Sequence, residues 1–169
     1  MPFHLTPPDP SDDASIDHLL RAAFDGPLEA ELVAKLRLEG DLAIALVARS
    51  AGAVVGYVAA SPASPGRGLG LAPVAVDASH RRLGVARALI DACIDRARGA
   101  GYRYMIVLGD PAYYARFGFR PASHHGLRCV FGGGDAFQVL ALAPGGLPDP
   151  GTLVEYAPAF GLFDAGPSA

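Results

Sequence analysis

Apolar side chains in the N-terminal part of the chain recur at the spacing of amphipathic helices. After a short strand predicted at Phe3–Leu5, the polar residues Ser11-Asp12-Asp13 are suited to cap a helix. Its apolar stripe has the three- and four-residue spacing of a helix face and consists of Ile16, Leu19, Leu20 and Ala23. Gly26-Pro27 ends that helix, and a second one is predicted from Leu28 to Gly40.

Continuous apolar runs bounded by turn residues predict a set of strands. The runs 42–47 and 54–60, separated by Ser50-Ala51-Gly52, are typical of a β-hairpin. A third strand is predicted at Leu69–Val76. The run Tyr104–Leu108 is apolar throughout, which predicts a strand buried on both faces. Two more strands are expected near Leu127–Phe131 and Ala136–Leu142.

The helical period returns after residue 84. One face of this third helix is apolar and holds Val85, Ala88, Leu89, Ala92 and Cys93. The Cys93 thiol is therefore expected to be buried. Gly99 and Gly101 end the helix. A short helix is predicted from Asp110-Pro111 to Phe117, with Gly118 as its end.

The order of these elements predicts a mixed α/β (α+β) fold. Strands and helices alternate only in the second half of the chain, which disfavours a pure doubly wound sheet. We assign residues 1–145 to one domain and 146–169 to a Pro/Gly-rich C-terminal tail that packs on the domain or trails from it. From Pro144 onward we expect a loose tail with one short strand near Leu153–Tyr156.

The composition narrows the functional classes. Hydrophobic residues make up 51% of the chain and charged residues 18%, which excludes a disordered protein. A net charge of −3 argues against a general nucleic-acid binder. No apolar run reaches the roughly 20 residues that a membrane span needs, and the start does not resemble a signal peptide, so a cytoplasmic protein is expected. Cys93 and Cys129 form no metal-type pair, and no metal is expected.

The segment 71–90 carries the most specific chemical signal, because an apolar strand runs into a tight turn that opens a helix. The free N–H groups and partial positive charge of a helix N-terminus bind anions. Gly84 lets a phosphate approach the backbone, and Ala86 keeps a nearby position small. Positive charge is added by Arg81, Arg82 and Arg87. The turn therefore suits a pyrophosphate, with a basic surface turn as the alternative.

Two segments, which follow one another along the chain, resemble motifs of a known family. The residues Arg81-Arg82-Leu83-Gly84-Val85-Ala86 match Gln/Arg-x-x-Gly-x-Gly/Ala, and Tyr114 to Phe119 match Tyr-x-x-x-Gly-Phe. These are motifs of the GNAT superfamily of acyl-CoA-dependent N-acyltransferases, which the chain resembles over roughly residues 3–142. The specific part of the resemblance lies between Leu69 and Phe119.

The resemblance implies a largely antiparallel central sheet with helices on both faces and two splayed parallel strands, 69–76 and 104–108. The gap between them would hold the pantetheine arm of acetyl-CoA, the implied cosubstrate, like an added strand. Main-chain contacts would come from Ala75 and Val76, with the Val76 N–H pointing at the acyl carbonyl. The pyrophosphate would lie on Arg81, Arg82, Leu83, Gly84, Val85 and Ala86.

The implied reaction is the direct attack of a primary amine on acetyl-CoA in a ternary complex. Tyr114 is the predicted general acid, and a core aromatic is its alternative role. No general base is named. Glu31 lies four residues before Lys35, the spacing of a surface ion pair, and no better claim belongs to Glu29, Asp135 or Glu155. His80, beside the turn, is expected to have a charge or surface role.

Several alternatives stay open at this point. A non-catalytic acyl-CoA-binding module, sensing or regulatory, would keep the cofactor turn without turnover. Asp110 stands where many relatives carry Asn, and is either a helix N-cap or a cofactor contact. The expected partner is a small-molecule or peptide amine rather than nucleic acid or membrane. A monomer and a homodimer both remain compatible with the sequence.

Overall fold

The fold is built on one large sheet. A computed structural model describes residues 2–164 and 166–167. Its α-helices are α1 (Asp13–Ala23), α2 (Leu28–Glu39), α3 (Val85–Gly99) and α4 (Pro111–Tyr114). Its strands are β1 (His4–Thr6), β2 (Ile44–Ser50), β3 (Ala53–Ala63), β4 (Gly68–Val76), β5 (Tyr104–Leu108), β6 (Arg120–Pro121), β7 (Arg128–Cys129), β8 (Phe137–Ala141) and β9 (Leu153–Val154).

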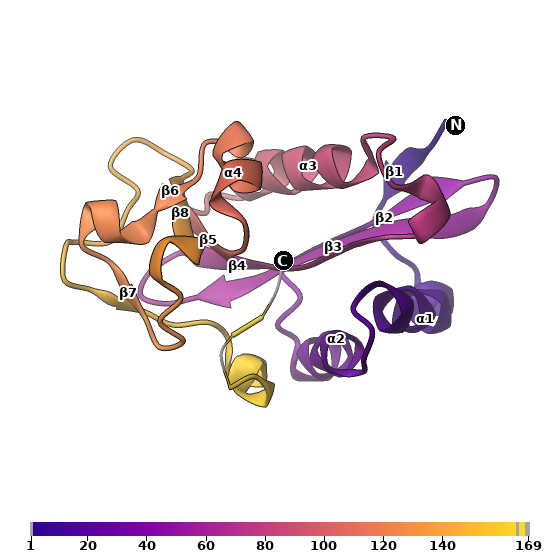
Figure 1. Cartoon of the computed structure of the whole chain (residues 1–169), viewed down its shortest axis with the longest axis horizontal. Coiled ribbons are helices and arrows are strands. Elements are labelled where there is room, and N and C mark those ends of the chain that lie inside the picture. Colours follow the sequence, from indigo (N-terminus) through magenta and orange to yellow (C-terminus); the bar gives the residue numbers. More distant parts are fainter. Residues whose placement is uncertain (1, 165, 168–169) are drawn as a thin grey trace.

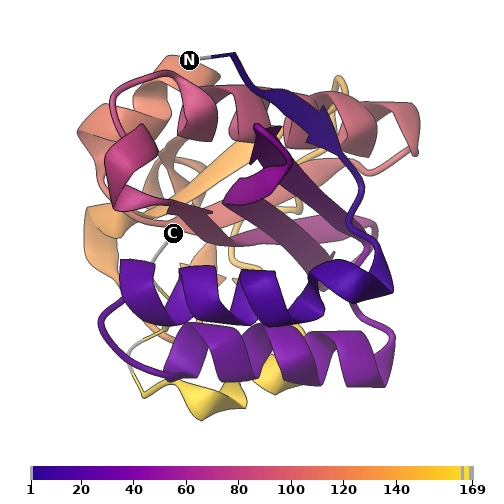
Figure 2. The ribbon, with the colours of Figure 1, turned by 90° about the vertical axis from the view of Figure 1, so that its right-hand side faces the viewer.

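The large sheet is mixed and mostly antiparallel, as predicted. Its order is β1-β2-β3-β4-β5-β8-β6, in which β4 and β5 are parallel and the other neighbours antiparallel. Helices α3 and α4 cover one face, and α1 and α2 cover the other (Figure 1). Seen from the side, α1 and α2 lie next to each other beneath the sheet (Figure 2). The predicted α/β class with helices on both faces is therefore confirmed.

Each face of the sheet has its own hydrophobic core. Under α3 the core includes Leu89 and Cys93, both without exposed surface. Burial raises the pKa of the Cys93 thiol to about 12, and the prediction of a buried thiol is confirmed. Under α1 and α2 the core includes Leu20 and Leu32, which are also fully buried. Because these apolar residues recur every three or four positions, they lie on one face of each helix, and that face is buried against the sheet.

The start of α1 is held by an ion pair that the sequence did not reveal. Asp12 occupies the N-cap position, but its carboxylate makes no capping bond to the helix. It accepts hydrogen bonds from Arg49 of β2 at 3.0 and 2.5 Å and from the Asp9 N–H at 2.7 Å. The Arg49 hydrogen bonds hold the pKa of Asp12 below its usual value. The pair fixes α1 to the sheet.

Strand β4 has a bulge in its pairing with β3, next to the point where β4 and β5 separate. Ala60 lies opposite Leu71 and Val58 opposite Val74, so β4 has one residue more than β3 in this interval. A bulge bends and twists its strand, and Pro73, within it, has no N–H to donate. Pairing between β4 and β5 extends only over Gly68–Gly70 and Tyr104–Ile106. Beyond Gly70 the strands diverge, which confirms the predicted splayed pair.

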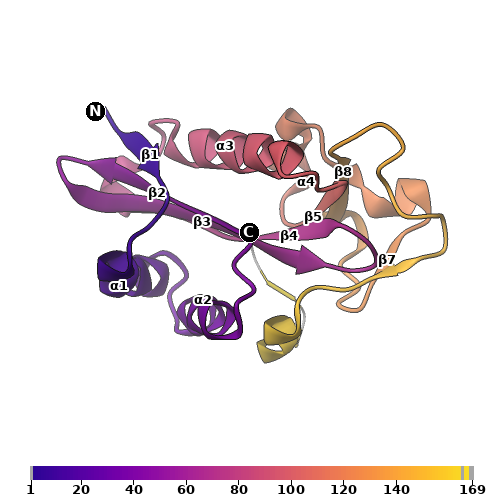
Figure 3. The same cartoon turned by 180° about the vertical axis from the view of Figure 1, so that it is seen from behind.

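Two expectations about the C-terminal third are confirmed only in part. The segment 127–131 forms only the two-residue strand β7, which pairs with β9 in a separate small sheet. The place beside β8 is taken by β6, whose two residues follow directly from the α4 region. The segment 153–160 is also not loose: β9 forms as expected, and Tyr156 and Phe160 are buried at 8% and 1% exposure. This segment packs beside α2 beneath the sheet (Figure 3).

The close packing of α3 on the sheet depends on Gly56 of β3. A Cβ placed there would lie 2.8 Å from Cγ1 of Val85, in the first turn of α3. We predict that Gly56→Ala lowers the free energy of unfolding by about 1–3 kcal/mol through overpacking. The matched control is Gly99→Ala at the end of α3, where a Cβ has no neighbour within 4 Å. Equal unfolding free energies for the two variants in chemical denaturation would contradict this packing.

Candidate active site

The gap between β4 and β5 exposes one edge of β4. Asp77, next after the strand, donates its N–H to the Val55 carbonyl on β3 at 2.8 Å. Because successive residues of a strand direct their backbone groups to opposite edges, the N–H and C=O of Val76 point into the gap. The Arg81 Nε, which donates to the Val76 carbonyl at 3.4 Å, reaches it from that side. Val74, two residues earlier, presents the same edge.

The turn after β4 is shaped by a short hydrogen-bonded cluster. The Asp77 carboxylate accepts from the Ser79 N–H at 3.3 Å and from the Ser79 hydroxyl, and the His80 Nδ1 lies 3.1 Å from it. Hydrogen bonds from Ser79 and then His80 lower the pKa of Asp77. This cluster stabilises the turn that leads the chain away from the sheet edge and into α3.

The backbone of the turn then adopts two left-handed residues before α3 begins. Arg82 has φ 62° and Gly84 has φ 82°. Gly84 is the N-cap, and its carbonyl accepts the first bond of the helix from the Ala88 N–H at 3.0 Å. The N–H groups of the first turn, before Ala88, therefore lack helical partners. Together with the helix dipole they form an anion site at the end of the gap.

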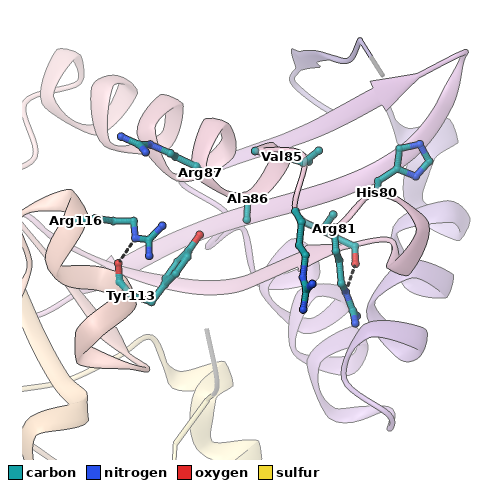
Figure 4. Close-up of a pocket in the computed structure, with 10 residues that line it drawn as sticks. His80, Arg81, Val85, Ala86, Arg87, Tyr113 and Arg116 are labelled. Carbon is teal, nitrogen blue, oxygen red and sulfur yellow. Dashed lines mark hydrogen bonds between the residues drawn. The ribbon is translucent and has the colours of Figure 1, made fainter.

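A cavity of about 550 Å³ lies between this turn and α4. Six predicted site residues line it: Val76, Arg81, Arg82, Gly84, Val85 and Ala86. Figure 4 shows the turn and the start of α3 on one side and Tyr113 with Arg116 on the other. The cavity thus connects an open strand edge with a helix N-terminus. Four arginines line it as well: Arg81, Arg82, Arg87 and Arg116. This combination suits a long anionic ligand.

Two predicted cofactor-binding residues do not line this cavity. Leu83 has a side chain that is 45% exposed and lies outside the lining. Ala75 is buried in the core beneath α1 and α2, on the other face of the sheet. Its side chain points away from the cavity, because adjacent residues of a strand point to opposite faces. Its N–H and C=O point toward β3 rather than into the gap, so the expected main-chain contact from Ala75 does not fit this geometry.

Tyr114 lies in a second cavity of about 330 Å³ that continues the first toward the sheet. Ala86 and Tyr113 line both cavities, and Val74 lines the second together with Tyr114. The Tyr114 side chain is 2% exposed, and its ring meets the Phe119 ring edge-on with centroids 5.7 Å apart. Burial, with a smaller contribution from Tyr113, raises the pKa of Tyr114 above its ordinary value. The hydroxyl therefore keeps its proton in neutral solution.

Several lining residues were not identified as site residues from the sequence. Tyr113, Arg116 and Arg87 face the large cavity, and Arg116 lies over the Tyr113 ring at 4.5 Å. Arg116 also donates from Nε to the Tyr113 carbonyl at 3.0 Å. Partial burial raises the pKa of Tyr113. Tyr113 and Arg116 could have been suspected from the sequence, because they lie close to Tyr114 in the chain. Which of these side chains faces the gap, however, depends on the orientation of α4.

Polar residues that were weighed for other roles fall into two groups. Asp110 accepts the Ala112 N–H at 3.0 Å, so its N-cap role is confirmed, and it also lines the small cavity. His80 lines the large one. The carboxylates weighed as bases line neither cavity: Glu29, Glu31, Asp135 and Glu155.

Within residues 2–164 and 166–167, no three or more His, Cys, Asp and Glu side chains cluster in a way that could hold a metal ion. No helix in these residues combines the length and apolar character required to cross a bilayer.

Comparisons with known proteins agree with this geometry. The chain is 46% identical to the N-acetyltransferase YhbS of Escherichia coli K12 over 160 residues, or 91% of this chain and 96% of that protein. The crystal structure of E. coli YhbS in complex with CoA superposes with a TM-score of 0.90 at 42% identity, covering 94% of this chain and 92% of the other. A GNAT family acetyltransferase from Brucella melitensis in complex with acetyl-CoA gives 0.80 at 33% identity, covering 94% and 98%.

The family profile gives the same result. A match to the acetyltransferase (GNAT) family extends over residues 14–119, from the start of α1 to the residue after Gly118. It includes the splayed strands, the turn before α3 and Tyr114. The chain therefore belongs to the GNAT family of acetyltransferases.

Proposed function

We propose that this protein transfers an acetyl group from acetyl-CoA to a primary amine by direct attack in a ternary complex. The observation that carries the proposal is the convergence of three features on one gap: the open edge of β4, the N-terminus of α3 and the Tyr114 hydroxyl. The two relatives whose structures contain CoA or acetyl-CoA support the choice of cosubstrate.

The gap accommodates the parts of acetyl-CoA in a definite order. The pyrophosphate would lie on the turn 81–86, where free N–H groups and arginine side chains meet. The pantetheine arm would follow the edge of β4, bonding to the N–H and C=O groups of Val74 and Val76 as an added strand does. The thioester would then reach the small cavity that Tyr114 lines.

The proposed reaction has one bond-forming and one bond-breaking event at the acyl carbon. The amine nitrogen attacks the thioester carbonyl, whose oxygen would accept the Val76 N–H. The carbon–sulfur bond then breaks, and Tyr114 gives its proton to the departing sulfur. The proton of the amine passes to water or a base. No base is assigned, because the carboxylates considered as candidates line neither cavity.

The lack of an assigned base gives one alternative some support. A non-catalytic acyl-CoA-binding module would use the same gap for sensing or regulation, without turnover. Release of free CoA thiol from acetyl-CoA with a panel of primary amines separates the two functions. Turnover with any amine supports the transferase, whereas tight binding of acetyl-CoA without turnover across the panel supports the module.

Gly84 tests the placement of the pyrophosphate. Gly84→Val puts a branched side chain at the N-cap, which should block close approach of the phosphate and weaken acetyl-CoA binding by roughly tenfold or more. Gly101→Val is the matched control, because Gly101 has φ 84° and, like Gly84, no neighbour within 4 Å of an added Cβ. Both variants bear similar backbone strain. Calorimetry that shows equal acetyl-CoA affinities for the two folded variants would contradict the placement.

The arginines of the turn provide a second test. Arg81→Ala and Arg82→Ala should each raise the dissociation constant for acetyl-CoA by roughly tenfold, because each removes a charge-assisted phosphate contact. Each should also flatten the salt dependence of binding. Arg96→Ala removes an exposed arginine at the far end of α3 and should leave binding unchanged. Unchanged affinity and salt dependence in both turn variants would reduce the turn to a solvated basic surface.

The acid role of Tyr114 is tested by removing one oxygen atom. Tyr114→Phe should lower turnover by roughly 10²-fold or more while acetyl-CoA affinity is retained, since the lost proton donor acts only as the thiolate leaves. Tyr113→Phe is the control, because its ring is perpendicular to that of Tyr114 at 5.1 Å. A larger loss for Tyr113→Phe would move the assignment, and no loss in either variant would leave water as the donor.

A further inference from the structure

Tyr156 lies against the point where β4 and β5 separate, on the face opposite Tyr114. Gly70 is the last residue of β4 that pairs with β5. A Cβ added at Gly70 would lie 2.7 Å from Cδ2 of Tyr156, so the ring occupies the space that any other residue at position 70 would need. Tyr156 belongs to the core that includes Leu32 of α2, whereas Tyr114 belongs to the core under α3.

The position of Tyr156 is fixed by backbone hydrogen bonds of the residue before it and by packing of its ring. The preceding residue, Glu155, exchanges two backbone hydrogen bonds with Ser64 at the β3–β4 turn, both 2.9 Å long. The Tyr156 ring packs on the rings of Phe131 and Phe160, with centroids 5.8 and 4.7 Å away. These contacts hold the ring at the end of the gap without using its hydroxyl group.

The Tyr156 hydroxyl is buried and has no hydrogen-bond partner among the residues that the structure describes. A buried hydroxyl without a partner is costly, and such groups are uncommon away from functional sites. Burial raises the pKa of Tyr156 well above its ordinary value, and negative charge on Cys129 or Tyr114 would raise this pKa further. The hydroxyl is therefore a neutral donor.

The two tyrosines border the gap from opposite faces: the Tyr156 ring contacts the Gly70 position, and Tyr114 lines the small cavity. The cavities that Tyr114 and Tyr113 line open on the α3–α4 face. The thioester would therefore come from that face to the fork, the point at Gly70 where β4 and β5 separate. Its carbonyl oxygen is an acceptor that needs a donor in a dry site. We propose that the Tyr156 hydroxyl donates a hydrogen bond to the acyl carbonyl oxygen of bound acetyl-CoA, opposite the Tyr114 hydroxyl at the sulfur. This assignment rests on the proposed function.

Tyr57 offers a matched control. It is also a fully buried tyrosine, and its hydroxyl likewise lacks a partner among the described residues. Its side chain packs in the core beneath α1 and α2, together with Leu20 and Val33. Loss of either hydroxyl should have a similar effect on the core, but only Tyr156 lies at the fork.

The test compares acetyl-CoA with CoA, which lacks the acyl group. Tyr156→Phe should weaken acetyl-CoA binding by roughly fivefold, the effect of one hydrogen bond, and leave CoA binding unchanged. Tyr57→Phe should change neither affinity. Neither variant should unfold at a lower midpoint than the wild type, because each loses a buried hydroxyl that has no partner among the described residues. With acetyl-CoA labelled with ¹³C at the carbonyl, infrared spectra should show a higher carbonyl frequency in Tyr156→Phe than in the wild type.

Each remaining outcome has a distinct meaning. Equal weakening of acetyl-CoA and CoA binding, or no change in either together with an unshifted carbonyl band, would overturn the assignment of Tyr156 and leave the transferase proposal intact. Wild-type protein that binds neither acetyl-CoA nor CoA would overturn the proposed function itself. Gly70→Ala provides a second variant, because the added Cβ should displace the Tyr156 ring. It should reproduce the selective loss of acetyl-CoA affinity if the protein folds.

Discussion

The bulge in β4 is the constraint on which the rest of the site depends. Two residues of β4, Ala72 and Pro73, oppose one residue of β3, Ala59, and Pro73 has no N–H. Strand β5 therefore follows β8 along its whole length and leaves β4 after residue 70. An interior strand with an open edge would be a liability in most sheets. Here that edge ends at a helix N-terminus, which makes it a site for an extended anionic ligand.

The two faces of the sheet contribute differently to this gap. On one face, α3 and α4 supply the anion site, the arginines and Tyr114. On the other, the core under α1 and α2 is completed by Tyr156 and Phe160 from the C-terminal segment. The position of α3 relative to the strand depends on Gly56, and the position of the Tyr156 ring depends on Gly70. Packing on both faces thus determines the shape of the site.

The sequence predicted the features that local chemistry determines. Helix α3 and the turn before it could be recognised because the apolar period, Gly84 and the arginines all lie in one segment. Strand β6, Arg120–Pro121, could not be recognised, since two residues show no period. The burial of Tyr156 was missed because Pro and Gly dominate its neighbourhood, while its partners Phe131 and Gly70 are distant in sequence.

The candidate site shows the same division between local and non-local information. Six of the residues proposed for the cofactor turn and strand end line one cavity, because they follow one another along the chain. Tyr113 and Arg116 were not identified because their orientation depends on how α4 packs against β4. The roles of Tyr114 and of the turn residues in binding and catalysis remain predictions.

Amide hydrogen exchange along β4, followed by NMR with and without acetyl-CoA, tests most directly whether the open edge holds the cofactor. The N–H groups of Val74 and Val76 point into the gap, whereas the Asp77 N–H is already bonded to Val55. Saturating acetyl-CoA should slow exchange at Val74 and Val76 and change Asp77 much less. Binding of acetyl-CoA with no added protection at Val74 or Val76 would contradict the placement of the cofactor in the gap.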